Sequence, residues 1–440
     1  MTFLKTIRII AMFVAPVATN LVASGAEPFS PKTAASFRQT GDSDATAEDT
    51  LETNPYLILM RKAAAHAREH GAPVPVLSPI DRSVIPDGYR PFHTCITPPS
   101  KPANGEKLEL VPVKELQAQG IRIVPWTTND PEMMRVFIQR GVDGLITDRP
   151  DLLQQVLAEE RTKADAATLQ RLSTFDVDAH RGGCGLRPEN TLPSFESGLD
   201  ELITTIETDT GVSTDHISTI WHDQYYSPEA CRRVDGKPYT FADRIYLSDI
   251  SSREAQKILI CDKLPFGEPQ SNDLALSPVS VAFARQEHLD SPYVPTNLDQ
   301  LFRFVRFYSR FYRSGPGKLH PEAAKRAANA DKVRFNIEIK NYPENTEPMR
   351  LRLGAILGVY IAPEMLKNHS AETKLFVKTL TNTIKRYGMA KRSEIQSINY
   401  YALQMVEEMH SGIPTYYLST DAYLFRTTFV PEQLRLAPKK

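Results

Sequence analysis

The stretch VPWTTNDPEMMRVFIQRGVDGLITDRPDLL, Val124–Leu153, carries the signals of several structural elements in close succession. It contains, in order, a strand, a helix, a short strand that ends in Thr-Asp, and the start of a second helix. Helices that alternate with strands favour an α/β architecture with parallel strands. The stretch is typical of the end of a barrel, yet DAHRGGCGLRPENTLPSF, Asp178–Phe195, is typical of a beginning and comes later in the chain.

Further segments are predicted to be strands because they alternate apolar and polar residues or are rich in β-branched ones. They are FDVDAH (175–180), LITTIETD (202–209), VRFNIEIK (333–340) and EIQSINY (394–400). The segment 227–295 is rich in loops and too long for an ordinary connection, so we interpret it as an insertion. The segment 302–313, FRFVRFYSRFYR, mixes arginines with aromatic residues as some nucleic-acid-binding proteins do. Its apolar residues recur at helical spacing, however, and predict an amphipathic helix with a solvated basic face.

The rest of the chain divides by composition. Residues 27–108 are predicted to be a leader and an irregular connection, apart from a helix at 56–69. Residues 109–157 hold the two helix–strand units of the first stretch. Residues 158–175 are charged and rich in alanine and are predicted to be a tether, and residues 176–440 form the main part of the fold.

The chain has 440 residues and an almost balanced charge, with 52 Lys and Arg against 53 Asp and Glu and a net charge of −1. A nucleic-acid partner usually requires a basic surplus, so the composition argues against one. The hydrophobic share of 41% is sufficient for a sizeable core.

The first 26 residues have the three parts of an export signal. Lys5 and Arg8 give a positive start, residues 9–23 are apolar, and residues 24–26 are small. An N-terminal membrane anchor is the alternative, but the apolar run is short for a span and is interrupted by polar and proline residues. We therefore predict a cleaved signal, a periplasmic or secreted protein, and no stable membrane span after the signal is removed.

Export makes disulfide bonds possible. The four cysteines are Cys95, Cys184, Cys231 and Cys261; they allow three pairings if all are bonded, and we favour Cys231 with Cys261. The chain has no CxxC spacing, which argues against a zinc site. Cys184 lies in the HRGGCG loop and could be a nucleophile, but the stronger chemistry around it disfavours that role.

Two of the predicted strands carry polar residues on one face. Glu207 and Asp209 are two residues apart, so both side chains point the same way, as do those of Asn336, Glu338 and Lys340. Three carboxylates that converge at strand ends form an all-oxygen site for a hard cation such as Mg²⁺ or Ca²⁺. Ordinary salt bridges are the alternative.

Two histidines lie at the ends of predicted strands. His180 ends one strand, and His222 ends another with Asp223 beside it. Near a carboxylate cluster, such a pair fits a general acid and a general base. In a barrel, catalytic groups gather at the carboxyl ends of the strands, where all of these residues are expected. The other eight histidines, such as His66, are interpreted as structural.

Together these motifs resemble the glycerophosphodiester phosphodiesterase family. The motifs that carry the resemblance are HRG…PENTL (180–192), E-x-D (207–209), HD (222–223), IEIK (337–340), QS (396–397), PWTTN (125–129) and GVDGLITDRP (141–150). The resemblance implies a (β/α)₈ TIM barrel with a small insertion after the second strand. It also implies hydrolysis of small-molecule glycerophosphodiesters to an alcohol and glycerol 3-phosphate, with one divalent cation, Ca²⁺ or Mg²⁺.

Roles follow from the matched positions. The resemblance implies a catalytic pair, three metal ligands and three substrate-binding residues: His180 and His222; Glu207, Asp209 and Glu338; and Arg181, Lys340 and Trp126. Two other functions stay open, namely a phospholipase-type enzyme acting on lipid headgroups and an inactive barrel that binds a phospho-ligand. Retention of both histidines and all three carboxylates argues against the inactive barrel.

The order of the motifs implies a circular permutation in which strands 7 and 8 precede strand 1. The first and last strands of a barrel are neighbours, so its old ends can be joined, here through residues 154–175. A faint similarity between residues 54–77 and 399–418 is what a tandem duplication would leave. The alternative is a relic domain ahead of a truncated barrel, which would expose two strand edges. Closure within one chain is expected, with strand 8 beside strand 1 and strand 7, IRIVPW, beside the strand that ends near Tyr400. Two copies could instead exchange strands.

Overall fold

The computed structural model describes residues 53–84, 110–343, 369–409, 412–420, 422 and 424–437. The predicted signal at 1–26 and Cys95 lie outside these ranges. All of the described residues belong to the unit Glu48–Lys440. Within them, no helix has the length and apolar character needed to cross a membrane.

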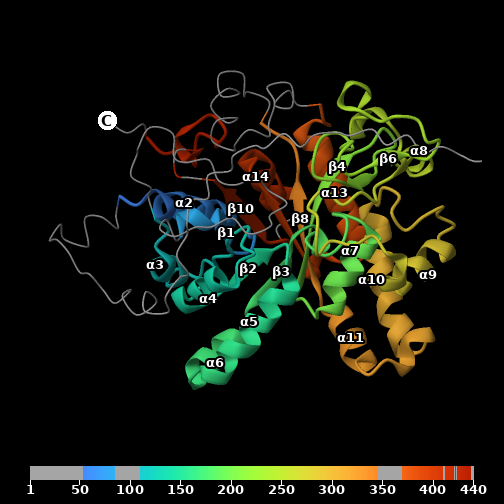
Figure 1. Ribbon diagram of the computed structural model, residues 1–440. Coiled ribbons are helices and arrows are strands. Elements are labelled where there is room, and N and C mark those ends of the chain that lie inside the picture. Colours follow the sequence, from blue (N-terminus) through green and yellow to red (C-terminus); the bar gives the residue numbers. More distant parts are fainter. Residues whose placement is uncertain are drawn as a thin grey trace, which may run out of the picture. The chain divides into compact units, whose positions relative to one another are not determined.

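Helices and strands alternate along most of the described chain (Figure 1). The strands are β1 (Val76–Pro79), β2 (Gly144–Thr147), β3 (Asp176–Ala179), β4 (Thr205–Val212), β5 (Ser218–Ile220), β6 (Arg232–Arg233), β7 (Leu259–Ile260), β8 (Arg334–Ile339), β9 (Ser393–Ser397) and β10 (Thr415–Ser419). The α-helices are α2 (Pro55–Glu69), α3 (Val113–Gln117), α4 (Pro131–Arg140), α5 (Pro150–Lys163), α6 (Ala166–Ser173), α7 (Leu192–Asp200), α8 (Ser252–Ile258), α9 (Pro278–Gln286), α10 (Leu298–Arg313), α11 (Ala323–Ala330), α13 (Thr373–Arg386) and α14 (Tyr400–Met409).

Local sequence sets several helix ends. The Asp130 side chain accepts hydrogen bonds from the first amides of α4, Pro131 occupies its first turn, and Gly141 ends it in the left-handed region with φ 84°. Asn297 and Gln300 form a reciprocal capping box at the start of α10. The predicted amphipathic helix at 302–313 is confirmed as the greater part of α10, whose apolar side is buried.

The strands form one curved parallel sheet in the order β1-β10-β9-β8-β4-β3-β2, with β5 added antiparallel to β4. Residues 122–126 connect its two outer strands. On one side, the Leu77 amide donates to the Arg122 carbonyl and the Val124 amide donates to the Leu77 carbonyl, both at 3.0 Å. On the other side, the amide of Ile146 in β2 donates to Pro125 at 2.9 Å. The seven parallel strands and this segment therefore close into a ring within one chain, as the predicted (β/α)₈ barrel requires.

The predicted position of the segment IRIVPW is wrong in one respect. It was expected beside the strand that ends near Tyr400, which is β9, but β1 and β10 lie between them. Three strands of the ring rather than two precede β3, and four rather than five follow it. The missed strand is β1, within the range 72–108 that was predicted to be irregular. Its short VLSP sequence follows two prolines, which mask the usual strand signal.

The faint similarity between residues 54–77 and 399–418 has a structural origin. The two segments are consecutive helix–strand units of the ring, α2 with β1 and α14 with β10. Their strands pair in parallel, with Val76 opposite Tyr416, and their helices pack together. Equivalent positions in a barrel impose similar patterns, so no duplication is needed to explain the likeness. The predicted tether at 158–175 is also mostly helical, formed by the end of α5 and by α6.

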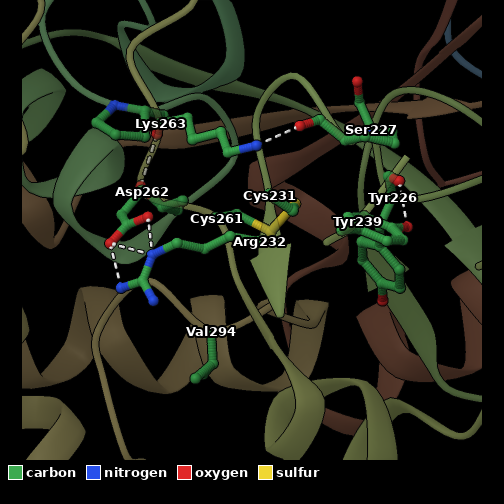
Figure 2. The surroundings of a disulfide bond; sticks show 12 residues. Tyr226, Ser227, Cys231, Arg232, Tyr239, Cys261, Asp262, Lys263 and Val294 are labelled. Atoms are coloured by element: carbon green, nitrogen blue, oxygen red, sulfur yellow. Dashed lines mark hydrogen bonds and ion pairs between the residues drawn. A yellow bond between two sulfur atoms is a disulfide. The ribbon is translucent and has the colours of Figure 1, made fainter. Parts of the chain in front are cut away.

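The insertion after β4 has its own small core. Strands β6 and β7 pair antiparallel, and the predicted disulfide between Cys231 and Cys261 joins them (Figure 2). Buried aromatic and aliphatic side chains pack around it, including Trp221, Tyr226 and Leu259. This module follows β5, and its residues Leu247 and Ser248 line a small pocket together with Gly211 and Lys340.

Candidate active site

The three predicted metal-ligating carboxylates meet at the carboxyl ends of two neighbouring strands. Glu207 and Asp209 lie on β4, and the pairing of β4 with β8 places Glu338 directly opposite Asp209. All three are buried. One oxygen of each lies within 4.8 Å of an oxygen of the other two. The structure therefore confirms that these three carboxylates lie close together, as their spacing in the sequence predicted.

Amide side chains inside the barrel hold these carboxylates in place. Gln396 on β9 donates from Nε2 to Glu207 Oε1 at 3.0 Å and to Glu338 Oε2 at 3.2 Å. Asn336 in turn donates from Nδ2 to Asp178 Oδ2 at 3.0 Å and to Gln396 Oε1 at 3.3 Å. Asp178 lies on β3, two strands away from Asn336 in the sheet, so the two side chains meet across the barrel interior. Gln396 belongs to the QS motif, but the sequence alone assigns it no role.

Two cationic side chains flank the cluster. Lys340 Nζ lies 2.8 Å from Glu338 Oε1 and 3.3 Å from Asp209 Oδ1. The backbone amide of Arg181 donates to Glu207 Oε2 at 2.8 Å, and its guanidinium pairs with Glu189 and approaches Asp209 at 3.3 Å. Arg181 has φ 50°, a left-handed conformation that turns the chain sharply after His180.

The carboxylates have unequal electrostatic surroundings. Burial raises the pKa of Glu207 well above its ordinary value, and repulsion from Asp209 and Glu338 adds to the rise. Burial also acts to raise the pKa of Asp209, but Lys340, His222 and Arg181 more than offset it, so the pKa of Asp209 is lowered. Like charges forced together out of water are costly unless a cation compensates them. The oxygen-only donor set and the mutual repulsion fit a divalent cation of the Mg²⁺ or Ca²⁺ kind.

His180 is held by a chain of side chains from the neighbouring strands. Its Nδ1 lies 2.6 Å from Asp148 Oδ1, at the end of β2. Asp148 Oδ2 accepts from Asn129 Nδ2 at 2.7 Å, and Asn129 Oδ1 accepts from the Asp148 amide at 2.8 Å. An imidazole whose Nδ1–H donates to a carboxylate keeps Nε2 as a proton acceptor. Asp148 and Asn129 both lie in motifs of the family resemblance, but the sequence alone assigns them no role.

His222 follows β5 and is oriented by its neighbour. Its Nδ1 lies 2.8 Å from Asp223 Oδ1, and its side chain is 33% exposed compared with 8% for His180. It is close enough to Asp209 to contribute to lowering the pKa of that carboxyl. A small pocket beside it is bounded by Asp223, Gln224 and Lys340 and by Ser248 of the insertion. Both predicted histidines thus reach the carboxylate cluster, one enclosed and one open to solvent.

Trp126 and Cys184 complete the predicted set. The Trp126 indole donates to the backbone oxygen of Ser78 at 3.0 Å, and its ring packs on the cluster formed by Val76, Val124, Ile146 and Tyr416. This places the ring at the carboxyl end of its strand, and a contact with substrate stays a prediction. Cys184 is disulfide-bonded, so it provides neither a nucleophilic thiolate nor a metal ligand beside His180 and Asp148.

Comparison with known proteins points to one family. The model of the glycerophosphoryl diester phosphodiesterase family matches the chain in two separate segments, residues 83–152 and 180–306, together somewhat less than half of the sequence. The probable glycerophosphodiester phosphodiesterase 2 of Mycobacterium tuberculosis is 35% identical over 63 residues, which are 14% of this chain. The match spans 24% of the length of that relative. In sequence, the chain therefore resembles this family.

The chain also has a distant likeness to solved structures of phosphodiesterases. A putative glycerophosphoryl diester phosphodiesterase from Silicibacter pomeroyi shares 17% identity with a TM-score of 0.37, over 60% of this chain and 68% of its own. A phosphodiesterase from Oleispira antarctica, solved with the product sn-glycerol-3-phosphate, shares 16% identity with a TM-score of 0.31, over 54% of this chain and 64% of its own.

The carboxylate cluster generates a prediction about metal binding. Glu338→Gln should weaken Mg²⁺ or Ca²⁺ binding by about tenfold or more, because it removes one anionic ligand and keeps the shape of the side chain. Isothermal titration of the purified protein with each cation measures the change. Glu254→Gln removes an exposed carboxylate of α8 and should leave both titrations unchanged. An unaltered titration for Glu338→Gln would exclude this residue as a ligand.

Proposed function

We propose that the chain is a metal-dependent phosphodiesterase that hydrolyses glycerophosphodiesters to an alcohol and glycerol 3-phosphate. One observation carries the proposal. Three buried carboxylates, two positively charged side chains and two histidines that are each paired with a carboxylate lie together at the carboxyl end of one barrel. The family match over both segments of the chain supports the same reaction class.

The charged groups would bind and polarise the phosphodiester. Glu207, Asp209 and Glu338 would hold the cation, which when bound supplies positive charge to offset the charge that builds on the phosphoryl oxygens. Arg181 and Lys340 would donate hydrogen bonds to the same oxygens. Ion pairs with the carboxylates fix the side chains of Arg181 and Lys340 before the substrate binds. Less reorganisation of these charged groups is then needed during the reaction.

The two histidines would divide the proton transfers. One removes a proton from the attacking oxygen as its bond to phosphorus forms, and the other gives a proton to the alcohol oxygen as its bond to phosphorus breaks. Over the whole reaction, one water is consumed and no redox partner is required. His180, held by Asp148, and His222, held by Asp223, each keep Nε2 for this exchange.

Hydrolysis of glycerophosphocholine by the purified protein tests the proposal. We expect release of glycerol 3-phosphate that stops with a chelator and returns on addition of Mg²⁺ or Ca²⁺. Binding of the diester without turnover at any metal concentration would instead favour an inactive binding barrel. Turnover only of an intact lipid in a bilayer would favour a phospholipase-type enzyme.

Loss of either histidine should reduce the chemical step. His180→Ala and His222→Ala are each expected to lower kcat by roughly 10²–10⁴, the usual contribution of a general acid or base. Steady-state kinetics at saturating cation measure the effect. His216→Ala, a change at the exposed turn between β4 and β5, is the matched control and should retain full turnover. Near-normal turnover in either active-site variant would refute its catalytic role.

The contact between His180 and Asp148 gives a separate prediction. Asp148→Asn preserves shape but no longer favours a proton on Nδ1, so kcat should decrease by up to about 10⁴ with little change in KM. The double variant with His180→Ala should be no slower than His180→Ala alone, because both changes affect one unit. Asp151→Asn, three residues further on, alters a pair with Arg149 only and serves as control. Additive losses in the double variant would show that Asp148 acts independently of His180.

We also propose that the protein is exported. The disulfide between Cys231 and Cys261 and the disulfide-bonded state of Cys184 support this, because such bonds persist mainly in oxidising compartments.

The order of the strands supports a circular permutation, with its break between β10 and α2. The order of the strands along the chain and their order around the ring differ only there. β10 and β1 are paired neighbours in the ring but lie at opposite ends of the sequence. The carboxyl-terminal residues lie against α2, where Lys62 Nζ donates to the Arg435 carbonyl at 2.9 Å. Described residues near the two ends of the chain are therefore in contact.

A reordered chain tests the permutation. We expect residues 174–437, followed by a flexible linker and residues 53–173, to fold cooperatively and hydrolyse the same diester, because every strand keeps its neighbours. Thermal unfolding and the hydrolysis assay are the measurements. Deletion of 53–153 should give an aggregated or molten product, because it removes three adjacent strands of the ring. A folded, active product of that deletion would favour the relic domain instead.

A further inference from the structure

Two helices at opposite ends of the chain bring together a second group of metal-ligating side chains. His66 lies in the last turn of α2, and His70, four residues later, is the residue that caps the carboxyl end of this helix. Glu408 lies on α14, which packs against α2. One potential ligand atom from each of the three residues lies within 4.8 Å of those of the others. This group is separate from the catalytic carboxylates in residues and in donor type.

Hydrogen bonds fix both imidazole rings in the orientation that a metal requires. His66 Nδ1 lies 2.6 Å from Glu407 Oε2, a carboxylate with no exposed side-chain surface. His70 Nδ1 lies 2.9 Å from the His66 backbone carbonyl, which can only accept, so His70 carries its proton there. Both rings therefore present Nε2 as the available lone pair, and His66 Nε2 lies 3.4 Å from Glu408 Oε1.

Glu407 is itself held in place. Its Oε1 accepts from Thr415 Oγ1 at 2.6 Å and from the Tyr417 hydroxyl at 3.1 Å, both on β10. A buried carboxylate that fixes the Nδ1–H of a histidine is the usual supporting partner of a metal-bound imidazole. A simple ion pair on the surface would need neither the second histidine nor this support.

We propose that His66, His70 and Glu408 form a zinc-class metal site that clamps α2 to α14. Two imidazoles and one carboxylate suit Zn²⁺, which binds such ligands at about 2.0–2.2 Å in a tetrahedron and here leaves one position for water. The three ligand atoms lie within 4.8 Å of one another, so coordination would require side-chain rotations that draw them closer. The absence of CxxC spacing does not bear on this site, because it uses no cysteine. His66, interpreted from the sequence as structural, becomes a ligand.

The location indicates that a metal at this site would stabilise the closed ring. His66 and Glu407 are 341 residues apart in sequence, and their helices flank the point where the ring is not covalently continuous. A metal shared by both helices would tie the amino-terminal part of the fold to its carboxyl-terminal part. It would be absent from the unfolded chain, so its binding free energy would add to the stability of the closed ring.

Zinc titration in the presence of saturating Ca²⁺ tests the site, because Ca²⁺ occupies an all-oxygen site and competes poorly for imidazole. We expect one Zn²⁺ bound per chain and a rise in Tm with Zn²⁺ that Ca²⁺ alone does not give. His70→Ala and Glu408→Gln should each weaken Zn²⁺ binding at least about tenfold and abolish the Tm rise. Glu69→Gln, an exposed neighbour on α2, should change neither.

Two further variants separate this site from the catalytic cluster. Glu338→Gln should retain the zinc-dependent rise in Tm, whether or not the chain proves to be a phosphodiesterase. Glu407→Gln should weaken Zn²⁺ binding by roughly 10–100-fold through His66 alone. Unchanged Zn²⁺ stoichiometry and affinity in both His70→Ala and Glu408→Gln would overturn the proposal. Loss of the Tm rise in Glu338→Gln but not in His70→Ala would assign the zinc effect to the catalytic cluster.

Discussion

The fold depends on the hydrogen bonding of residues 122–126 to β1 on one side and β2 on the other. Without this segment, two strands would present unpaired backbone groups along their edges, which a parallel sheet surrounded by helices does not tolerate. Hydrogen bonds depend on which strands are neighbours and not on the order in which the chain visits them. The ring can therefore be built from a sequence that begins in its middle, provided every edge finds its partner.

Closure also brings the chemistry together. Asp148 and His180 directly follow β2 and β3, which pair residue by residue, and β4 and β8 carry the carboxylates beyond them. At the other end of the barrel, burial acts to raise the pKa of Asp176 but Arg334 and Arg122 lower it to about 2. Arg122 belongs to the closing segment and Arg334 to β8, so this ion cluster ties the closing segment to the strands that hold the site. Charged side chains thus face inward at both ends of the barrel. Those around Asp176 stabilise the fold, and those at the carboxyl ends of the strands form the candidate active site.

The sequence predicted what depends on spacing along one element. The two-residue separation of Glu207 and Asp209 is sufficient to place both inside the barrel, and the motif around Glu338 identifies the facing strand. It did not predict β1, because VLSP is short and follows prolines, so neither length nor alternation marks it. Asp148 was missed for a different reason. It is 32 residues from His180, and only the pairing of β2 with β3 reveals that they touch. Gln396 likewise acts only through strands that are distant in sequence.

The chain is not continuous between β10 and α2, so noncovalent contacts rather than the peptide backbone must hold this part of the ring together. In an uninterrupted barrel the peptide backbone would lead from that strand into that helix and limit how far they could separate. Here noncovalent contacts must hold the two elements together. They are the pairing of β1 with β10, the contact between the aromatic rings of Tyr56 and Phe425, and the hydrogen bond from Lys62 to the Arg435 carbonyl. Each joins residues that are hundreds of positions apart, so forming them costs the loop-closure entropy of nearly the whole chain. Selection for extra contacts should therefore be strongest at this seam. The buried Glu407, which joins α14 and β10 to His66 of α2, lies where that pressure would act.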